Sequence, residues 1–239
     1  MLYVIGLGLG DEKDITVNGL EIAKNCECYL EMYTSKWSGS LKKLEEMIGD
    51  EIHILKRRDL EDKLPDFLQE CKTKNVALFV LGDPLAATTH VDIVLQAKRH
   101  GIKVRIIHNS SIFSAVAETG LQLYKFGKTA TVPFTLQFDA VQDALIANEK
   151  AGLHTLLLLD LDAEKERYMS VGEALKLLLE KKLLLKNQKV VVASAVGTER
   201  SEIHFGEASK YINHKETPAI IVVPGKLHFM EEGFLESLR

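Results

Sequence analysis

Short apolar runs alternate with amphipathic segments along most of this chain. Residues 76–81 are apolar at every position, which is typical of a strand buried on both faces in a parallel sheet. Residues 91–100 then follow a helical pattern that ends at Gly101, and residues 102–107 form the next apolar run. This alternation of strand and helix patterns predicts a parallel sheet with helices on its faces.

The same alternation covers the chain from its first residues. It predicts three more strands and three more helices, namely strands at 2–5, 28–32 and 52–55, and helices at 17–25, 41–48 and 60–72. Pro65 lies within the last of these helices, although proline is tolerated only in the first turn of a helix.

A second series of strands and helices begins after a connector at residues 121–127. Ser170 and Glu173 form the pattern of a capping box, which predicts the start of a leucine-rich helix. The predicted strands lie at 129–134, 155–159, 190–193 and 219–223, with an edge strand at 202–205, and the predicted helices lie at 136–150 and 170–184. We therefore expect an α/β protein with two α/β lobes, residues 1–110 and residues 111–239.

Composition and charge narrow the classes of function. The formal net charge is −4 and the pI is about 6.1, which argues against general binding of nucleic acid. The three cysteines are too few for a disulfide framework, and Cys26 and Cys28 lack the spacing of a CxxC site. Gly6 and Gly8 interrupt the first apolar run, and no segment approaches the roughly 20 apolar residues of a membrane helix. We therefore expect a cytoplasmic protein that does not span a membrane.

The turn Gly82-Asp83-Pro84 follows the most apolar of the predicted strands. Glycine permits a tight turn and proline restricts the loop, so we expect the Asp83 carboxylate at the carboxyl end of that strand. Ligands of open α/β sheets bind at this edge. Small or kinked residues also follow other predicted strands, at 6–10, 109–112, 159–160, 196–197 and 224–228. Together they predict a cleft that is rich in backbone donors and acceptors and poor in charge.

The glycine loop at residues 6–11 departs from the fingerprint of dinucleotide-binding proteins. The pattern GxGxxG would need a glycine at Asp11, or at Lys13 if the pattern began at Gly8. The acidic residues that follow the glycines would also repel a phosphate. These features disfavour a diphosphate site, and two other interpretations remain: a less anionic ligand that the backbone approaches closely, and a tight turn without a ligand.

Other candidate residues give no pattern of metal or nucleophilic chemistry. HxxxH, CxxC and the Gly-x-Ser-x-Gly elbow are absent from the sequence, so we expect no metal site. Ser110 or Ser111 is a candidate N-cap for a helix that ends at Gly120, and His108 is expected to be satisfied by its neighbours. The predicted cleft is therefore lined by backbone groups and small side chains, which suit a large, partly apolar ligand better than a triphosphate.

Six short motifs are distributed along nearly the whole chain, at residues 6–16, 33–35, 82–90, 108–112, 124–127 and 224–228. Together they resemble the diphthine synthase family, which belongs to the tetrapyrrole-methylase-like class of S-adenosylmethionine-dependent methyltransferases. The glycine loop and Gly-Asp-Pro are shared across that class. The segments Ala-Thr-Thr-His, Tyr-Lys-Phe-Gly and Gly-Lys-Leu-His are more specific to diphthine synthases.

The resemblance implies two lobes with S-adenosylmethionine in the crevice between them, and a homodimer. It implies methylation of the amine of the 3-amino-3-carboxypropyl group on the modified histidine of translation elongation factor two, a step of diphthamide biosynthesis. The number of methyl groups, and whether a methyl ester also forms, stay open. Ala86 stands where a bulkier residue is common in the family and Val196 where alanine is expected, so both would contact the cofactor through the backbone. The cofactor contacts carried over by motif are Leu9, Asp83, Ala86, Ser111, Ile112, Leu159, Val196 and His228.

Methyl transfer from a sulfonium needs neither a metal nor a covalent enzyme intermediate, so we expect no indispensable acid or base. Lys125 and Lys226 lie beside the predicted ligand loops, and either could pair with the carboxylate of the substrate. Three alternatives stay open: a methylase of the same class that acts on a precorrin, a nicotinamide-dependent oxidoreductase, and a binding module without turnover. The family-specific motifs disfavour the first, and the missing fingerprint disfavours the second.

Overall fold

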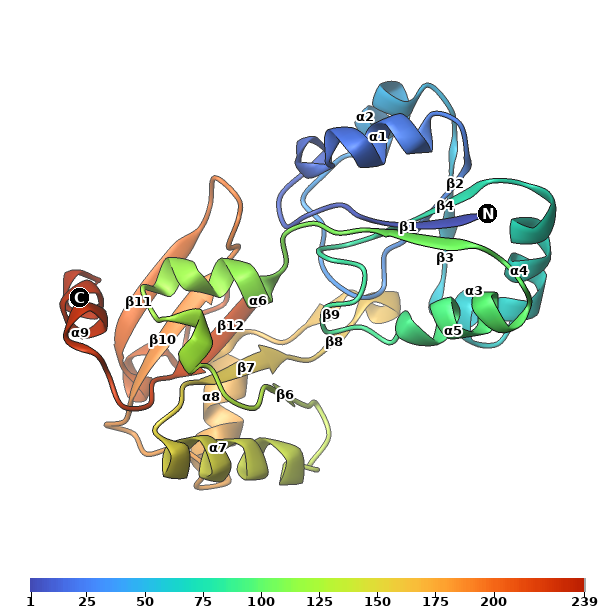
Figure 1. Ribbon diagram of the computed structural model, residues 1–239. Coiled ribbons are helices and arrows are strands. Elements are labelled where there is room, and N and C mark those ends of the chain that lie inside the picture. The colour runs from blue at the N-terminus through green and yellow to red at the C-terminus, as the bar shows by residue number, and fades with distance from the viewer. Residues whose placement is uncertain (239) are drawn as a thin grey trace. The chain divides into compact units, whose positions relative to one another are not determined.

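A computed structural model describes residues 1–238 of the chain (Figure 1). The chain forms two compact units, Met1–Phe113 and Ser114–Arg239. Each unit contains one five-stranded sheet, and each has its own hydrophobic core.

The sheet of the first unit is entirely parallel, as the sequence predicts. Its strands are β1 (Leu2–Gly6), β2 (Glu27–Glu31), β3 (Ile52–Leu55), β4 (Val76–Val80) and β5 (Val104–Ile107). Their order in the sheet is β3-β2-β4-β1-β5, so β4 is the central strand. All five residues of β4 are buried, which confirms that its apolar run marks a strand covered on both faces.

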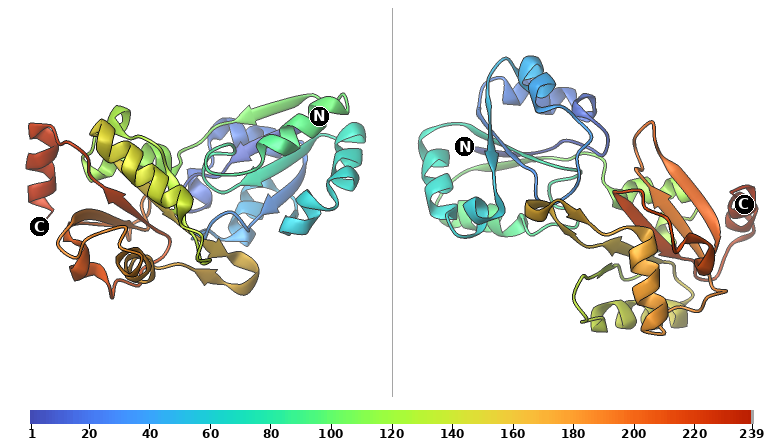
Figure 2. Two further views of the ribbon diagram at one scale, coloured as in Figure 1. Left: turned by 90° about the horizontal axis from the view of Figure 1, so that it is seen from below. Right: turned by 180° about the vertical axis from the view of Figure 1, so that it is seen from behind.

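Helices cover both faces of this sheet (Figures 1 and 2). They are α1 (Val17–Ala23), α2 (Leu41–Ile48), α3 (Arg57–Glu61), α4 (Leu64–Thr73) and α5 (Val91–Arg99). On β4, Ala77 and Phe79 pack in the cluster that contains α1 and α2, whereas Leu78 and Val80 pack in the cluster that contains α3, α4 and α5. This alternation follows from the pleat of a strand, in which successive side chains point to opposite faces.

The predicted helix at 60–72 is wrong in its start, because the chain forms two helices there. Helix α3 ends at Glu61, and α4 begins at Leu64 with Pro65 in its first turn. A helix begun at residue 60 would place Pro65 beyond the first turn, where proline lacks the amide that the helix needs and clashes with the preceding turn. The proline therefore sets where α4 begins.

The second unit contains a mixed sheet. Its strands are β6 (Ala130–Val132), β7 (Thr155–Leu159), β10 (Lys189–Ser194), β11 (Glu202–Glu207) and β12 (Ala219–Val223). Their order is β11-β10-β12-β7-β6; only β6 and β7 are parallel, and the other pairs are antiparallel. The predicted edge strand at 202–205 is confirmed, because β11 lies at one edge beside β10.

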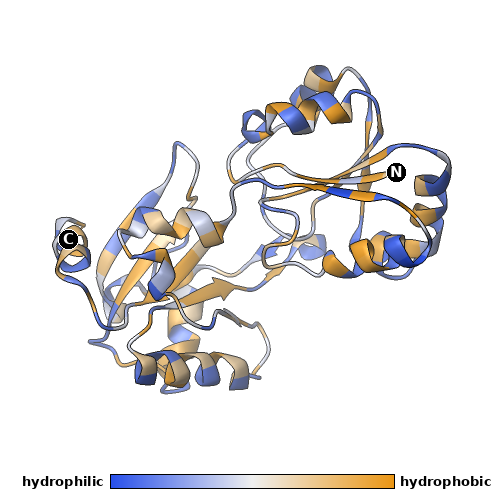
Figure 3. Ribbon diagram, viewed as in Figure 1, coloured by the Kyte–Doolittle hydropathy of each residue, from blue (hydrophilic) through white to orange (hydrophobic). Residues whose placement is uncertain are grey.

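The helices from residue 112 onward are α6 (Ile112–Ala115), α7 (Asp139–Ala151), α8 (Val171–Glu180) and α9 (Phe229–Ser237). The core of the second unit joins α7 and α8 to the strands through leucine, valine and alanine side chains. Strands of both sheets are largely hydrophobic in Figure 3, whereas the helices show both hydrophobic and hydrophilic residues. The helices α7 and α8 therefore bury one side against the strands, as their amphipathic patterns predict.

Several boundaries in the second unit differ from the predictions. Helix α7 begins at Asp139 rather than at residue 136, and α8 ends at Glu180 rather than near residue 184. Lys182 has a φ of +58°, a left-handed conformation that cannot continue a helix. The two-stranded hairpin of β8 (Leu161–Asp162) and β9 (Arg167–Tyr168) was not predicted, because strands of two residues leave no readable alternation.

Candidate functional site

The loop after β1 and the turn after β4 are joined by their main chains. The amide of Gly8 donates to the carbonyl oxygen of Gly82 at 3.2 Å, and the amide of Gly82 donates to the carbonyl oxygen of Gly8 at 2.8 Å. A Cβ atom on Gly6 would lie 2.5 Å from the Gly82 oxygen and 3.0 Å from Cδ of Pro84. Residue 6 therefore has to be glycine for the two segments to approach this closely.

Gly8 and Gly82 both have left-handed backbones, with φ values of +78° and +74°. A Cβ atom on Gly8 would lie 2.6 Å from Cβ of Asp14, so the loop is tightly packed on that side. Among the described residues, a Cβ atom on Gly82 would meet only the carbonyl oxygen of Ser110, at 3.9 Å. The turn after β4 therefore leaves space next to the segment that leads into Ser111.

The Asp83 carboxylate connects the turn after β4 to the end of β5. Its Oδ1 atom accepts a hydrogen bond from the Leu85 amide at 3.0 Å, within its own turn. Its Oδ2 atom accepts from the Asn109 amide at 3.2 Å and pairs with Nδ1 of His108 at 2.7 Å. Asp83 thus lies at the carboxyl end of the central strand, as predicted, and it also orders the neighbouring segment. His108 has the neighbouring partner that the sequence predicts for it.

Asn109 links the same segments from the other side. Its Nδ2 atom donates to the carbonyl oxygens of Gly6 and Asp14, both at 2.9 Å, and its Oδ1 atom accepts from the Ser110 amide at 2.8 Å. Sequence reasoning placed Asn109 in a family motif but gave it no role. Its amide group is needed here because it both donates to carbonyl oxygens and accepts from an amide.

Glu31 lies at the carboxyl end of β2, near the place of a ribose-binding acid in a dinucleotide fold. It is fully buried, and its carboxylate accepts hydrogen bonds from the amides of Tyr33, Thr34 and Leu81 and from the Thr34 hydroxyl. Burial raises the pKa of Glu31 although these hydrogen bonds oppose the shift. The carboxylate therefore satisfies hydrogen-bond donors of its own loop and of the residue that follows β4.

His90 is buried next to these loops, at the start of α5. Its Nδ1 atom lies 2.8 Å from the hydroxyl of Thr88, and its Nε2 atom lies 3.3 Å from the hydroxyl of Tyr33. Burial lowers the pKa of His90 to about 4, so the ring is neutral at physiological pH. Two family-like motifs, at residues 33–35 and 87–90, are thereby brought into contact.

Three predicted contacts lie in the second unit, next to the ends of strands or helices. Leu159 is the last residue of β7, Val196 follows β10 and is buried, and His228 is the exposed N-cap residue of α9. The segment before Val196 is held by a contact of 2.6 Å between the Ser194 hydroxyl and Nε2 of His214. The sequence predicts neither this contact nor helix α9.

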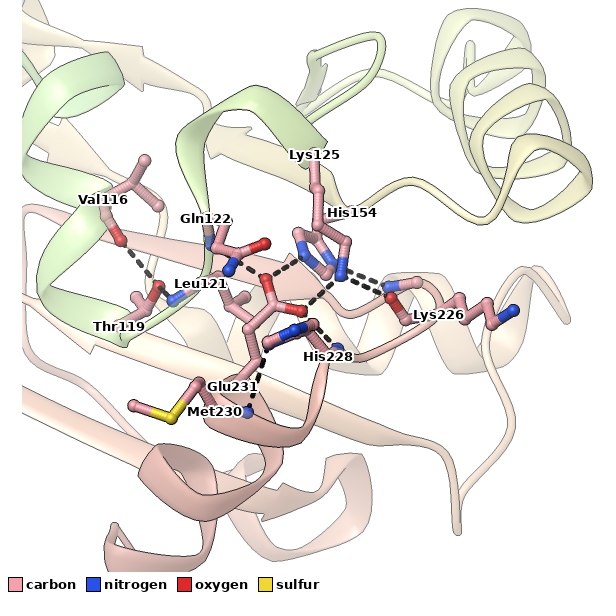
Figure 4. Close-up of polar contacts among 11 residues, drawn as sticks. Val116, Thr119, Leu121, Gln122, Lys125, His154, Lys226, His228, Met230 and Glu231 are labelled. Carbon is pink, nitrogen blue, oxygen red and sulfur yellow. Dashed lines mark hydrogen bonds and ion pairs between the residues drawn. The ribbon is translucent and has the colours of Figure 1, made fainter.

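A buried carboxylate, Glu231, is the centre of a polar network in the second unit (Figure 4). It accepts hydrogen bonds from the amides of Gln122 at 2.9 Å and His228 at 2.7 Å, from Nε2 of His154 at 3.0 Å, and from the ammonium group of Lys125. Burial alone would raise the pKa of Glu231, but the hydrogen bonds together lower it to about 2. Glu231 is therefore ionised and paired with Lys125.

Lys125 and Lys226, which the sequence offers as equal candidates for binding a carboxylate, have different environments in the structure. The ammonium group of Lys125 is engaged by Glu231 and donates to the carbonyl oxygen of Lys226 at 2.7 Å. The side chain of Lys226 is exposed and points away from this network in Figure 4. Among the described residues it forms no ion pair, so Lys226 is the better candidate for binding a carboxylate.

The predicted cofactor contacts fall into two groups. Those of the first unit follow β1, β4 and β5, which are adjacent in a parallel sheet, so their carboxyl ends lie at one edge. Their contact with a cofactor stays a prediction. The first group is Leu9, Asp83, Ala86, Ser111 and Ile112, and the second group is Leu159, Val196 and His228.

Other site chemistries receive no support within residues 1–238. No group of three or more metal-ligating side chains is found in that part of the chain, and none of its helices is long and apolar enough to cross a membrane. Cys26, Cys28 and Cys71 are free thiols, and burial raises the pKa of Cys28 and Cys71 to about 12. These thiols are un-ionised at neutral pH and unsuited to nucleophilic catalysis.

Comparison with known proteins identifies the fold and the family. Residues 1–211 match the family model of the tetrapyrrole (corrin/porphyrin) methylases. A crystal structure of a diphthine synthase superposes with a TM-score of 0.93 at 38% sequence identity, covering 99% of this chain and 95% of that chain. The crystal structure of a putative diphthine synthase from Entamoeba histolytica superposes with a TM-score of 0.87 at 34% identity, covering 100% of this chain and 98% of that one.

Diphthine synthases of two archaea match the chain over its full length. The diphthine synthase of Methanocaldococcus jannaschii is 42% identical, and that of Methanococcus maripaludis is 40% identical; each match covers 100% of this chain and 98% of the relative. The chain therefore belongs to the tetrapyrrole methylase family of S-adenosylmethionine-dependent methyltransferases and, within it, to the diphthine synthases.

Proposed function

We propose that this enzyme methylates the amine of the 3-amino-3-carboxypropyl group on the modified histidine of translation elongation factor two, in diphthamide biosynthesis. The observation that carries the proposal is the 42% identity to a diphthine synthase over the full length of both chains. A precorrin methylase is a weaker candidate, because the segments at 87–90, 124–127 and 224–228 match diphthine synthases rather than the wider family.

The carboxyl edge of the first sheet fits S-adenosylmethionine. Gly6 brings the main chains of two loops into contact, and Gly82 leaves open space beside the segment leading to Ser111. The side chains of Asp83 and Asn109 are already hydrogen-bonded within and between these loops, so this edge offers mostly backbone groups. We propose that the residues in contact with the cofactor are Leu9, Asp83, Ala86, Ser111, Ile112, Leu159, Val196 and His228.

The cofactor would supply a methyl group on a sulfonium, which an amine attacks in line with the departing sulfur. The residues of the chain then have to orient the two reactants, and positioning of this kind can contribute about 7–11 kcal/mol. Removal of water from the site favours the neutral form of the attacking amine. The role proposed for Lys226 is to pair with the carboxylate of the same substrate group, which would orient the amine.

Assembly and location belong to the same proposal. By resemblance we propose that the protein is a homodimer and works in the cytoplasm. We also propose that each protomer has two lobes, residues 1–110 and 111–239. Size-exclusion chromatography coupled to light scattering would measure the mass of the assembly. A monomer at micromolar concentration would contradict the homodimer without affecting the proposed reaction.

Mass spectrometry of the protein substrate tests the reaction directly. The enzyme is incubated with S-adenosylmethionine and with elongation factor two that carries the unmethylated 3-amino-3-carboxypropyl-histidine. The expected result is a mass increase by whole methyl groups on the peptide that contains this histidine, and their number answers the question that the sequence leaves open. An unchanged peptide, together with methylation of a tetrapyrrole in a parallel reaction, would favour the alternative function.

Thermal stabilisation separates the remaining alternatives. S-adenosylhomocysteine, the product of methyl transfer, should raise the melting temperature, whereas NAD should not, because ligands stabilise only the state that binds them. Stabilisation by NAD alone would support an oxidoreductase. Binding of S-adenosylhomocysteine without turnover on any substrate would support a binding module.

A further inference from the structure

The loop at residues 225–228 is held at three main-chain groups by three different side chains. The Gly225 amide donates to Nδ1 of His154 at 2.9 Å, and the Lys226 carbonyl oxygen accepts from Lys125 at 2.7 Å. The His228 amide donates to Glu231 at 2.7 Å. These three side chains come from three different segments of the chain, and together they constrain the loop at three of its four residues.

The three side chains also bond to one another. One carboxylate oxygen of Glu231 accepts from His154 and the other accepts from Lys125, so they form one connected network (Figure 4). An amide can only donate, so the Gly225 amide requires a lone pair on Nδ1 of His154. The proton of the neutral ring is then on Nε2 and faces Glu231. The network therefore contains one anion, one cation and a neutral imidazole, joined by hydrogen bonds to Glu231.

Such a buried network is costly to assemble and is weak support for stability by itself. Removing charges from water is expensive, and apolar residues of similar volume often stabilise a core equally well. Both Glu231 and His154 are completely buried. A buried polar network does, however, restrict the conformations of the segments that it bonds. Here those segments include the loop that carries His228 and Lys226.

We propose that Glu231, His154 and Lys125 are positioning residues for cofactor binding, which act by fixing the main chain of the 225–228 loop. Glu231 acts on the cofactor through the amide of His228, and His154 acts through the amide of Gly225. None of the three touches the cofactor itself. The inference rests on the proposed contact between His228 and S-adenosylmethionine, and it explains why two separate family motifs, at 124–127 and 224–228, occur together.

The test compares Glu231→Gln with Glu232→Gln. Glu232 is the next residue of α9, is exposed, and lies outside the network, so it controls for loss of one carboxylate in the same turn. Glutamine has a single oxygen acceptor and cannot accept all the donors that face Glu231. Calorimetric titration with S-adenosylhomocysteine should show a Kd increased about tenfold for Glu231→Gln and changed less than about twofold for Glu232→Gln.

Steady-state kinetics supply a readout that lost stability alone would not change. At a temperature at which circular dichroism shows both variants folded, Glu231→Gln should raise the KM for S-adenosylmethionine about tenfold while kcat stays nearly constant. A lower melting temperature with an unchanged Kd and KM would overturn the inference, because the network would then be merely structural.

A second variant keeps the proposal testable if Glu231→Gln does not fold. His154→Asn retains an oxygen acceptor for the Gly225 amide but loses the donor to Glu231. We expect its Kd for S-adenosylhomocysteine to rise about threefold to tenfold. An unchanged Kd in this variant overturns the inference.

His228→Ala distinguishes the proposed contact with the cofactor from the proposed positioning role. If His228→Ala binds S-adenosylhomocysteine as the wild type does, the proposed contact is wrong and the inference fails with it. If His228→Ala binds weakly but Glu231→Gln binds normally, the contact stands and only the positioning role is overturned. Binding that behaves as expected without methylation of elongation factor two would instead contradict the proposed reaction and leave the positioning role intact.

Discussion

The Oδ2 atom of Asp83 lies 2.7 Å from Nδ1 of His108, although the two residues follow different strands. The Asp83 side chain is only 14% exposed and the His108 side chain is 68% exposed. Exposed ion pairs contribute little, so the bonds from Asp83 to the amides of Leu85 and Asn109 are the more important ones.

Asp83→Ala should therefore weaken cofactor binding much more than His108→Ala. We expect the Kd for S-adenosylhomocysteine to rise more than about tenfold in Asp83→Ala and less than about threefold in His108→Ala. Calorimetry on both folded variants measures the difference. Equal affinities for Asp83→Ala and wild type would show that Asp83 is a turn residue without a role in the site.

Asn109→Ala should destabilise the first unit. It removes two donors and leaves the carbonyl oxygens of Gly6 and Asp14 without that partner, at an expected cost of about 1–3 kcal/mol in the free energy of unfolding. Trp37, the single tryptophan of the chain, lies in this unit and reports its unfolding by fluorescence in urea. Asn18→Ala, at an exposed position of α1, is the control and should change the free energy by less than about 0.5 kcal/mol.

Gly8→Ala separates backbone strain from steric overlap. Gly8 and Gly49 both have positive φ, but a Cβ atom at Gly8 would lie 2.6 Å from Cβ of Asp14, and one at Gly49 would meet nothing within 4 Å among the described residues. Gly49→Ala should cost only the strain of the left-handed backbone, roughly 1–2 kcal/mol. Gly8→Ala should cost more and should also weaken binding of S-adenosylhomocysteine. Identical effects of the two variants in calorimetry and in urea would contradict the close packing of the loop.

The neutral state of His90 predicts a pH dependence of stability. Burial lowers the pKa of His90 to about 4 in the folded protein, from about 6.5 when unfolded. A depressed pKa contributes stability above the unfolded value, and this is lost as the pH falls towards the folded value. Between about pH 7.5 and pH 5 the loss should be about 2 kcal/mol.

His90→Gln should remove this part of the dependence. Urea unfolding followed by Trp37 fluorescence at the two pH values measures it, and His100→Gln, at the exposed end of the same helix, serves as the control. The control should keep the full dependence of the wild type. If the free energy of unfolding of His90→Gln depends on pH as strongly as that of the wild type, the titrating group is another residue.

Lys226→Met tests recognition of the substrate carboxylate. Because its ammonium group is exposed and forms no ion pair among the described residues, its loss should leave the fold and the cofactor affinity unchanged. The KM for elongation factor two should rise about tenfold, as expected for one charge-assisted contact. Lys128→Met, at another exposed position, should behave as the wild type. Normal kinetics of Lys226→Met would refute the assignment.

Local patterns predicted the elements of the fold more accurately than their pairing. Helix α2 and strands β3, β7 and β12 have the predicted limits, because each is a short amphipathic or apolar run between turn residues. The antiparallel direction of β12 beside both β10 and β7 could not be predicted, since an apolar run has the same appearance in either direction. Helix α9 was missed because it exposes Phe229 and Met230, which blurs its amphipathic pattern.

The candidate site was predictable where it depends on turn residues and not where it depends on distant pairs. Gly82-Asp83-Pro84 marks a strand end by its composition, and the structure places it there. Glu231 instead receives its donors from Gln122, Lys125 and His154, which lie 109, 106 and 77 residues away in sequence. No local spacing indicates such a network. Its only signal was a pair of motifs whose connection needs the folded chain.

The un-ionised thiols have a practical consequence for labelling the protein. Maleimides and related reagents react with thiolates, and the buried Cys28 and Cys71 offer almost none at neutral pH. The pKa of the half-buried Cys26 is raised by burial as well. A cysteine introduced at the exposed Glu232 should therefore take up a fluorophore or spin label selectively in the folded protein, without replacement of the native cysteines. A probe at that position would report directly on helix α9 during turnover.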